Sequence, residues 1–234
     1  MARILVCHGA WSSGWVWKKM RPLLKSAGHE LYVPTYTGLG ERLHLAKPEV
    51  DLDLHIRDVM AVIDMEDLSG LTLLGHSYGG MVATGVADRL RDRIDRLVYM
   101  DAFVPLNGQS ALDLMPEERR RKTLESVVEG WLLPPSPVPP DTSPEDVAWM
   151  KPRRVPQPVR TFQQPLRLSM DVPVADRTYI YCARIGAFDT FGPFAAMARR
   201  EPGWRYLEMD ASHSPHVTAP QALAQVLGEI VSRR

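Results

Sequence analysis

The sequence predicts an α/β fold with a mostly parallel central sheet and helices on both faces. Short apolar runs of strand length alternate with longer segments of helical periodicity, which is the pattern of consecutive βαβ units. The chain has 234 residues, enough for one large domain with a core of its own. Its 45% apolar and 24% charged residues are ordinary for a globular protein.

The pattern begins with a strand over residues 4–7. A helix is expected over 17–27, closed by Gly28, because a glycine often follows the last helical turn. A strand over 29–33 ends at Pro34. Asp51 then has the place of an N-cap for a helix that runs through Ile63. The remaining expected elements are strands over 71–74, 94–99, 179–182 and 204–209, a helix over 81–90 and a final helix from about residue 220.

Between residues 106 and 173 the alternation of strands and helices breaks. Half of the chain's 20 prolines lie between Pro134 and Pro165, and tryptophans are scattered through the stretch. A long irregular segment inside a compact domain is usually a functional lid or a linker. Its large apolar side chains favour an ordered lid. We therefore expect a core made of residues 1–105 and 174–234, with a lid inserted over 106–173.

Charge and cysteine content exclude several classes of partner. The 28 basic and 28 acidic residues give a formal net charge of zero, so we expect neither nucleic acid nor an acidic membrane as a partner. Cys7 and Cys182 each lie in an expected buried strand, which favours reduced core thiols. No signal peptide or membrane-length apolar run is present in the sequence, so a cytoplasmic protein is expected. The oligomeric state stays open, a homodimer included.

A Gly75-x-Ser77-x-Gly79 motif stands between an expected strand and an expected helix. In that context the motif is typical of a nucleophile elbow, a strained turn that exposes a serine above the sheet. Glycines are needed because side chains there would collide with neighbouring backbone. The simpler alternative is a serine in a tight turn, but the strand–turn–helix setting favours Ser77 as a nucleophile.

An acyl transfer also needs an oxyanion hole. One N–H donor is expected from Tyr78, the residue after the nucleophile. The other is expected from the loop after the first strand, and we assign it to Ala10. Gly9 would let that loop approach Ser77 closely. Without Ser77, an ordinary strand-to-loop turn would be the simpler interpretation of this loop.

The general base is expected just after the last strand. His213 lies in a turn of small residues there, and the chain order Ser, Asp, His is the one that this arrangement uses. His216 is the alternative, and we interpret it instead as a wall residue of the substrate pocket or a surface histidine.

The acid that orients the base is harder to assign. The usual position, in the loop after residue 182, holds Ile185, which cannot orient an imidazole. Asp101 ends the strand that follows the elbow helix, and Asp189 lies slightly late in the expected loop. We favour Asp101, because catalytic groups of open α/β sheets gather at the carboxyl ends of the strands. The alternatives are a loop cap for Asp101 and a helix N-cap for Asp189.

These residues predict serine hydrolase chemistry without a metal or cofactor. His213 would take the Ser77 proton as the serine oxygen attacks an ester carbonyl, and the N–H groups of Tyr78 and Ala10 would stabilise the oxyanion. The histidines are dispersed and the cysteines solitary, so no metal-ligand spacing is present. Four residues are candidates for the substrate pocket: Trp11, Trp131, Phe188 and His216. Each of them could equally fill the core.

The motifs over 8–15, 75–80 and 210–213 resemble one branch of the α/β-hydrolase fold. This branch holds plant methyl esterases, plant hydroxynitrile lyases and bacterial pyrethroid-hydrolase-like esterases. The segments over 37–42 and 97–105 look most like the bacterial esterases, and the resemblance spans nearly the whole chain. It implies hydrolysis of small, hydrophobic or aromatic esters under a helical lid.

The resemblance also names the alternatives to ester hydrolysis. Hydroxynitrile lyases carry a Thr where Gly9 stands and a Lys where Ser214 stands, so cyanohydrin cleavage is not expected. The departure at Ile185 leaves open a non-hydrolytic enzyme that cyclises or decarboxylates a polyketide-like intermediate. A third hypothesis is a small-molecule receptor built on the hydrolase fold. A serine esterase remains the favoured interpretation.

Overall fold

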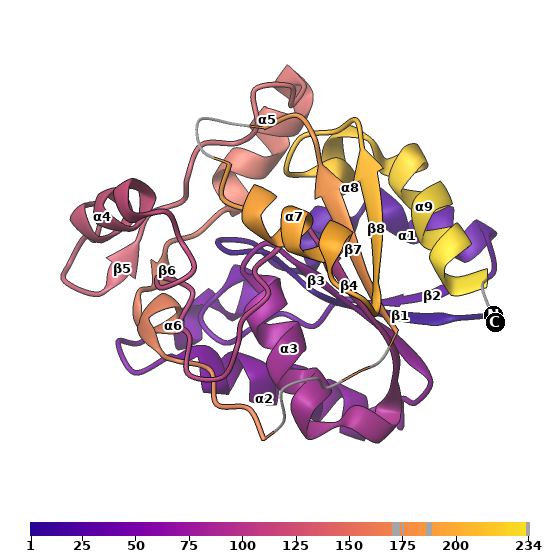
Figure 1. The fold of residues 1–234 in the computed structure, drawn as a ribbon. Helices are drawn as coiled ribbons and strands as arrows, with labels where there is room; N and C mark the ends of the chain where they lie inside the picture. Colours follow the sequence, from indigo (N-terminus) through magenta and orange to yellow (C-terminus); the bar gives the residue numbers. More distant parts are fainter. Residues whose placement is uncertain (170–173, 175, 186–188, 233–234) are drawn as a thin grey trace.

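The main sheet of the computed structural model has six parallel strands in the order β2-β1-β3-β4-β7-β8 (Figure 1). The structure describes residues 1–169, 174, 176–185 and 189–232. The strands are β1 (Arg3–Cys7), β2 (Glu30–Tyr32), β3 (Leu71–His76), β4 (Ile94–Met100), β7 (Arg177–Cys182) and β8 (Trp204–Met209). The predicted α/β fold is confirmed.

Helices cover both faces of this sheet. One buried cluster includes side chains of α2 (Leu52–Met65), α3 (Gly79–Arg89) and α7 (Gly192–Arg200). The opposite cluster includes side chains of α1 (Met20–Ser26) and α9 (Pro220–Ser232), with α8 (Pro215–Thr218) beside them. Both faces of the central strands are therefore buried, which is why β3 is apolar nearly throughout rather than alternating.

The first helix is shorter than the sequence predicts. A 3-10 turn, η1 (Gly14–Trp17), comes first, and α1 begins only at Met20. Pro22 has no N–H group, so a helix accommodates it only in its first turn, and α1 therefore starts just before it. Gly28 follows the end of the helix with a φ of +78°, as predicted for the residue after a helix.

Two other boundaries matter for the site. Strand β3 continues two residues beyond the predicted end, to His76, and α3 already begins at Gly79. Only two residues are left for the turn between them. Asp51 caps α2 as predicted, because its side chain accepts a hydrogen bond from the N–H of Leu54.

The residues between β4 and β7 form a separate set of short elements, which we call the inserted segment (residues 106–169). It contains helices α4 (Glu117–Glu125), α5 (Pro144–Met150) and α6 (Arg160–Gln163), and the 3-10 turn η4 (Lys151–Arg153). Strands β5 (Leu132–Leu133) and β6 (Gln157–Pro158) pair as an antiparallel sheet. Figure 1 shows these elements beside the main sheet, with α4, β5, β6 and α6 on the left. Two 3-10 turns, η2 (Gly40–Leu45) and η3 (Arg91–Arg93), complete the described elements.

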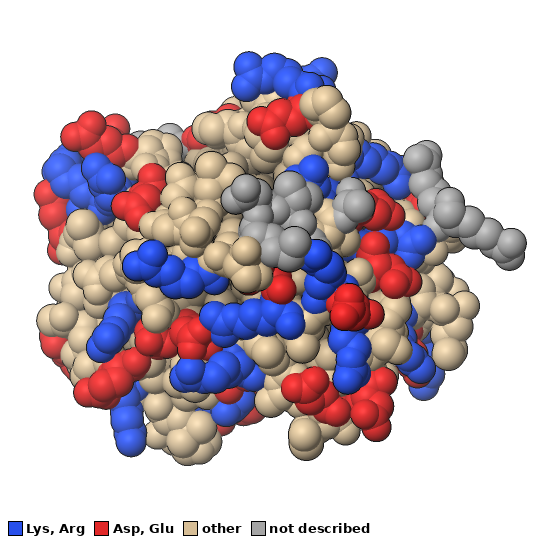
Figure 2. Space-filling view, turned by 60° about the horizontal axis from the view of Figure 1, so that its bottom comes forward, with Lys and Arg blue, Asp and Glu red and all other residues tan. Residues whose placement is uncertain are grey.

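Neither sign of charge dominates the face of the molecule seen in Figure 2. Figure 2 shows Lys and Arg side chains interspersed with Asp and Glu across the face in view, in keeping with the net charge of zero. Among the described residues, no helix combines the length and the apolar composition needed to cross a bilayer.

Candidate active site

Ser77 occupies the sharp turn between β3 and α3. Its φ is +57°, in the left-handed region that a residue with a Cβ enters at a cost of about 1 kcal/mol. Hydrogen bonds hold it there: its N–H donates to the Met100 carbonyl at 3.4 Å, and its carbonyl accepts from the Phe103 N–H at 3.2 Å. Every residue of β3 before it is buried, whereas Ser77 is partly exposed. The turn therefore lifts this one side chain out of the sheet.

The glycines around Ser77 are required by close backbone contacts. A Cβ on Gly75 would lie 2.8 Å from the Gly79 carbonyl oxygen, and one on Gly79 would lie 1.9 Å from the carbonyl oxygen of Cys7. A Cβ on Gly80 would lie 2.1 Å from the Phe103 carbonyl oxygen. Helix α3 thus packs so closely against the ends of β1 and β4 that only glycine fits at these three positions.

The structure brings His213 and Asp101 together. The Nδ1–H group of His213, in the turn after β8, donates to Oδ2 of Asp101 at 2.6 Å. Asp101 is 5% exposed, and its Oδ1 accepts from the Cys182 N–H at 3.5 Å. A carboxylate on Nδ1 fixes the tautomer of the imidazole and leaves Nε2 without a proton, as a general base requires.

The other carboxylates near this turn have different partners. Asp189 accepts hydrogen bonds from the Gly192 N–H at 2.7 Å and from the Tyr181 hydroxyl at 3.1 Å, so it serves the start of α7. Asp210 forms an ion pair with Arg184 at 2.7 Å. Ile185 is 57% exposed. Of the two candidate acids, only Asp101 bonds to the imidazole of His213 among the described residues.

Two further side chains contact His213, one at its backbone carbonyl and one at its ring, and were not singled out by the sequence. His76, the residue before the elbow serine, donates from Nε2 to the His213 carbonyl at 2.7 Å. The Phe191 ring stacks on the imidazole of His213 with centroids 5.0 Å apart and planes 5° apart. Burial lowers the pKa of His76 well below its ordinary value, so His76 stays neutral and adds no charge beside His213.

The loop after β1 passes directly against the elbow. A Cβ on Gly9 would lie 2.9 Å from Nδ1 of His76 and 3.2 Å from Cβ of Ser77. Ala10 is the next residue along this loop. No hydrogen bond between described residues uses the N–H group of Ala10 or of Tyr78. Both predicted oxyanion donors are therefore unoccupied by the described protein groups.

The sequence profile of the alpha/beta hydrolase family matches residues 4–226. The chain belongs to the α/β hydrolase family.

The relatives that match this hydrolase over nearly its full length include proteins that are named as esterases. The carbendazim hydrolyzing esterase of Nocardioides sp. (strain SG-4G) is 36% identical, and the match covers 98% of this chain and 100% of the relative. The pheophorbidase of Raphanus sativus is 28% identical over 96% of this chain and 92% of its own. Among solved structures, an extracellular alpha/beta-hydrolase from a Paenibacillus species superposes with a TM-score of 0.83 at 25% identity, covering 98% and 99% of the two chains.

The predicted pocket residues of the hydrolase lie in different places. Trp11 is partly exposed and follows Ala10, the predicted oxyanion donor, with a φ of +59°. Trp131 is partly buried, and its carbonyl accepts from the Val159 N–H within the inserted segment. Phe188 lies outside the described residues. These three assignments remain predictions.

His216 is not a surface residue, so that alternative was wrong. It is 2% exposed, stacks on the Trp17 ring at 4.7 Å and meets the His76 ring edge-on at 4.8 Å. Burial lowers the pKa of its imidazole to about 3. The short helix α8 begins at Pro215, directly after the base turn, and turns this ring inward. Its ring fills the layer behind His76, and a role in binding substrate remains a prediction.

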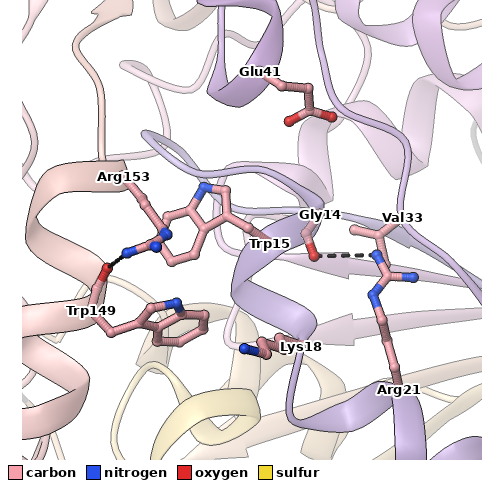
Figure 3. Close-up of a pocket in the computed structure, with 8 residues that line it drawn as sticks. All are labelled: Gly14, Trp15, Lys18, Arg21, Val33, Glu41, Trp149 and Arg153. Atoms are coloured by element: carbon pink, nitrogen blue, oxygen red, sulfur yellow. Dashed lines mark hydrogen bonds between the residues drawn. The ribbon is translucent and has the colours of Figure 1, made fainter.

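A cleft of about 460 Å³ lies apart from the Ser77 turn (Figure 3). It is lined by Gly14, Trp15, Lys18, Arg21, Val33, Glu41, Trp149 and Arg153, and Figure 3 shows Trp15 and Trp149 on one side of it. The two indoles meet edge-on with centroids 5.2 Å apart. None of the proposed site residues lines this cleft. Among the described residues, no cluster of His, Cys, Asp and Glu has the geometry of a metal site.

Proposed function

We propose that this α/β hydrolase is a serine esterase in which Ser77 is the nucleophile, His213 the general base and Asp101 the acid that orients the base. The observation that carries the proposal is the 2.6 Å hydrogen bond from His213 Nδ1 to Asp101 Oδ2 beside the strained Ser77 turn. The relatives that are named as esterases support ester hydrolysis.

The reaction follows from these positions. His213 Nε2 takes the proton of the Ser77 hydroxyl as its oxygen attacks the ester carbonyl. The oxyanion that forms is stabilised by the N–H groups of Ala10 and Tyr78, neither of which has a hydrogen-bond partner among the described protein groups. His213 then gives its proton to the leaving alcohol. A water molecule attacks the acyl-enzyme by the same route and frees Ser77.

We propose small hydrophobic or aromatic esters as the substrate class. The base is flanked by the Phe191 ring, and the Ala10 donor is followed by the partly exposed indole of Trp11. Aromatic walls bind flat apolar groups by burying their surface. The names of two relatives, the carbendazim hydrolyzing esterase and the pheophorbidase, refer to compounds with aromatic rings and support this substrate class.

Covalent labelling and hydrolysis test the proposal together. A fluorophosphonate probe should label the wild-type protein at Ser77, and p-nitrophenyl acetate should be hydrolysed. Ser77→Ala should abolish both, while its unfolding temperature stays within a few degrees of wild type. A panel of phenyl, benzyl and alkyl esters then ranks kcat/KM by acyl and alcohol group.

Two experimental outcomes would contradict this proposal and favour a different function. Turnover of a polyketide-like substrate that survives Ser77→Ala would favour a non-hydrolytic enzyme. Tight binding of a small molecule by a folded protein that neither labels nor hydrolyses would favour a receptor.

A further inference from the structure

We propose that the inserted segment contains a clamp, made of Gln157, Thr161 and Phe162, which holds the two N–H donors of the oxyanion hole in position. The clamp rests on the proposed function, because it acts on the donors assigned above to Ala10 and Tyr78. Its three residues touch Trp11, which follows Ala10, and the side chain of Tyr78. They are positioning residues and need not contact the substrate.

Trp11 is tied to the inserted segment at three points. Its N–H donates to Oε1 of Gln157 at 3.0 Å, and its carbonyl accepts from the Val155 N–H at 3.3 Å. Its indole N–H donates to the Leu133 carbonyl at 3.0 Å. These bonds hold a left-handed φ of +59°, a conformation that a large side chain adopts only when its surroundings impose it.

Only one orientation of the Gln157 side-chain amide satisfies the hydrogen-bonding groups around it. Thr161 donates its hydroxyl proton to the Pro158 carbonyl at 2.7 Å, so its oxygen is free to accept. Nε2 of Gln157 donates to that oxygen at 2.8 Å, which leaves Oε1 facing the Trp11 N–H. Gln157 and Thr161 are both 0% exposed. In such a buried chain every polar group has a partner, and removing one member leaves the next unsatisfied.

The same helix reaches the second donor. The Phe162 ring of α6 stacks on the Trp11 ring at 6.0 Å and on the Tyr78 ring at 5.1 Å, so one side chain lies against both. The Thr161 hydroxyl lies close to the Tyr78 hydroxyl, which also donates to Nδ1 of His55 at 3.0 Å. The phenol of Tyr78 is thereby fixed from two sides, and its backbone N–H is fixed with it.

This arrangement matters because the N–H donors stabilise the oxyanion only when they lie close to the position where its negative charge develops. The peptide that Gln157 anchors is the one that follows Ala10, so the anchor sets where the Ala10 Cα and its N–H group lie. Preorganised donors stabilise the developing oxyanion, and losing one costs about 10²–10³-fold in kcat. A displacement of about 1 Å can cost about 10²-fold. Loosening the clamp should therefore reduce kcat while leaving substrate binding nearly intact.

Gln157→Met is the direct test, because methionine is close in size but has no amide to accept from the Trp11 N–H or to donate to Thr161. We expect kcat for p-nitrophenyl acetate to fall about 10- to 100-fold with KM within about threefold of wild type. The matched control is Gln163→Met, an exposed position at the end of the neighbouring helix α6, which should keep wild-type kcat. Fluorophosphonate titration of active sites corrects for any inactive fraction.

A transition-state probe separates positioning from general damage. A phenyl trifluoromethyl ketone reacts with the serine and forms an oxyanion, whereas the matching phenyl methyl ketone binds without doing so. In Gln157→Met the affinity for the trifluoromethyl ketone should weaken by about the factor lost in kcat, while the affinity for the methyl ketone stays unchanged. Equal weakening of both ketones, or an unchanged kcat, would overturn the clamp.

Thr161 supplies a second pair of variants in case Gln157→Met does not fold. Thr161→Val removes the hydroxyl at nearly constant shape and should lose kcat, whereas Thr161→Ser retains the hydroxyl and should recover most of it. If serine fails to restore what valine removes, the hydroxyl chain is not what positions the donors. If the wild-type protein shows neither hydrolysis nor labelling, the proposed function is wrong. If the wild-type protein and the clamp variants are equally active, only the clamp proposal is wrong.

Discussion

The Nδ1 atom of His213 lies 2.6 Å from Oδ2 of Asp101, a carboxylate that follows strand β4 rather than strand β7. Strand β7 separates β4 from β8, so the turn that carries His213 must cross the end of β7 to reach its partner. Asp101 meets it with a φ of +44° and with its N–H bonded to the Ile180 carbonyl of β7 at 2.8 Å. The backbone conformation of Asp101 thus directs its carboxylate across the end of β7 toward His213.

Replacing Asp101 should separate the two candidate acids. Asp101→Asn keeps the shape but no longer supports the imidazolium or the required tautomer, so kcat should fall about 10³- to 10⁴-fold. Asp189→Asn should change kcat by less than about threefold, because Asp189 bonds to the start of α7. Steady-state kinetics of both variants on one ester settles the assignment. The reverse ranking would move the acid to Asp189.

His76 should act through the backbone of His213. His76→Leu removes the donor to the His213 carbonyl and should lower kcat about fivefold, the effect of about 1 kcal/mol for one hydrogen bond. His76→Gln can place an N–H near the position of Nε2 and should restore most of the loss. Measured kcat and KM values give the comparison. Equal activity in all three proteins would show that this bond does not position the base.

Gly9 should tolerate no side chain. In Gly9→Ala the new methyl would lie 2.9 Å from Nδ1 of His76 and 3.2 Å from Cβ of Ser77, so one of them must move. We expect a loss of about 1–3 kcal/mol in the free energy of unfolding and a marked loss of kcat. Gly228→Ala, in α9 with open space around its Cα, should instead stabilise by about 0.5–1 kcal/mol and leave kcat unchanged. Urea unfolding and ester hydrolysis measure both effects.

Folding stability should fall as the pH drops below about 6.5. Burial lowers the pKa of His216 to about 3, so between pH 6.5 and 3 the unfolded chain binds a proton that the folded chain does not. Such a group reduces stability by up to about 1.4 kcal/mol per pH unit in this window. Burial lowers the pKa values of His8 and His55 as well, to about 4 and about 3, and these groups act in the same direction.

His216→Leu tests this linkage against an exposed histidine. Without the buried imidazole, the stability of the variant should fall less steeply than that of wild type between pH 6 and 4. His44→Leu changes an exposed position and should leave the wild-type slope unaltered. Urea midpoints at each pH give the slopes. Parallel curves for His216→Leu and wild type would contradict the lowered pKa.

The sequence predicted the fold because its signals are local. Apolar runs marked each strand of the main sheet, and the spacing of Gly75, Ser77 and Gly79 marked the turn between β3 and α3. The position of Asp101 at the end of β4 was also readable, since parallel strands bring their carboxyl ends to one edge. The structure adds the bond to His213 that position alone does not establish.

The contacts that were missed are those between distant parts of the chain. Gln157 and Trp11 are 146 residues apart, and Gln157 lies in a proline-rich stretch without periodicity. In the sequence, His76 stands at an unspecified position of the Gly75-x-Ser77-x-Gly79 motif. Its partner is a backbone carbonyl, a group that every residue carries, so no sequence pattern marks this pair. The start of α1 shifted because Pro22 overrides helical periodicity. Tertiary packing decided the contacts of Gln157 and His76, whereas a local proline decided where α1 begins.

The place of His213 in the chain has a consequence for incomplete molecules. Ser77 and Asp101 both lie within the first half of the 234 residues, whereas the imidazole arrives only after the last strand of the sheet. A polypeptide that stops anywhere short of position 213 thus carries the proposed nucleophile and the proposed acid but lacks the proposed base that takes the Ser77 proton. Nonsense truncations and C-terminal clipping upstream of that point should yield hydrolytically silent products, so the activity of a preparation reports chains that extend at least through His213.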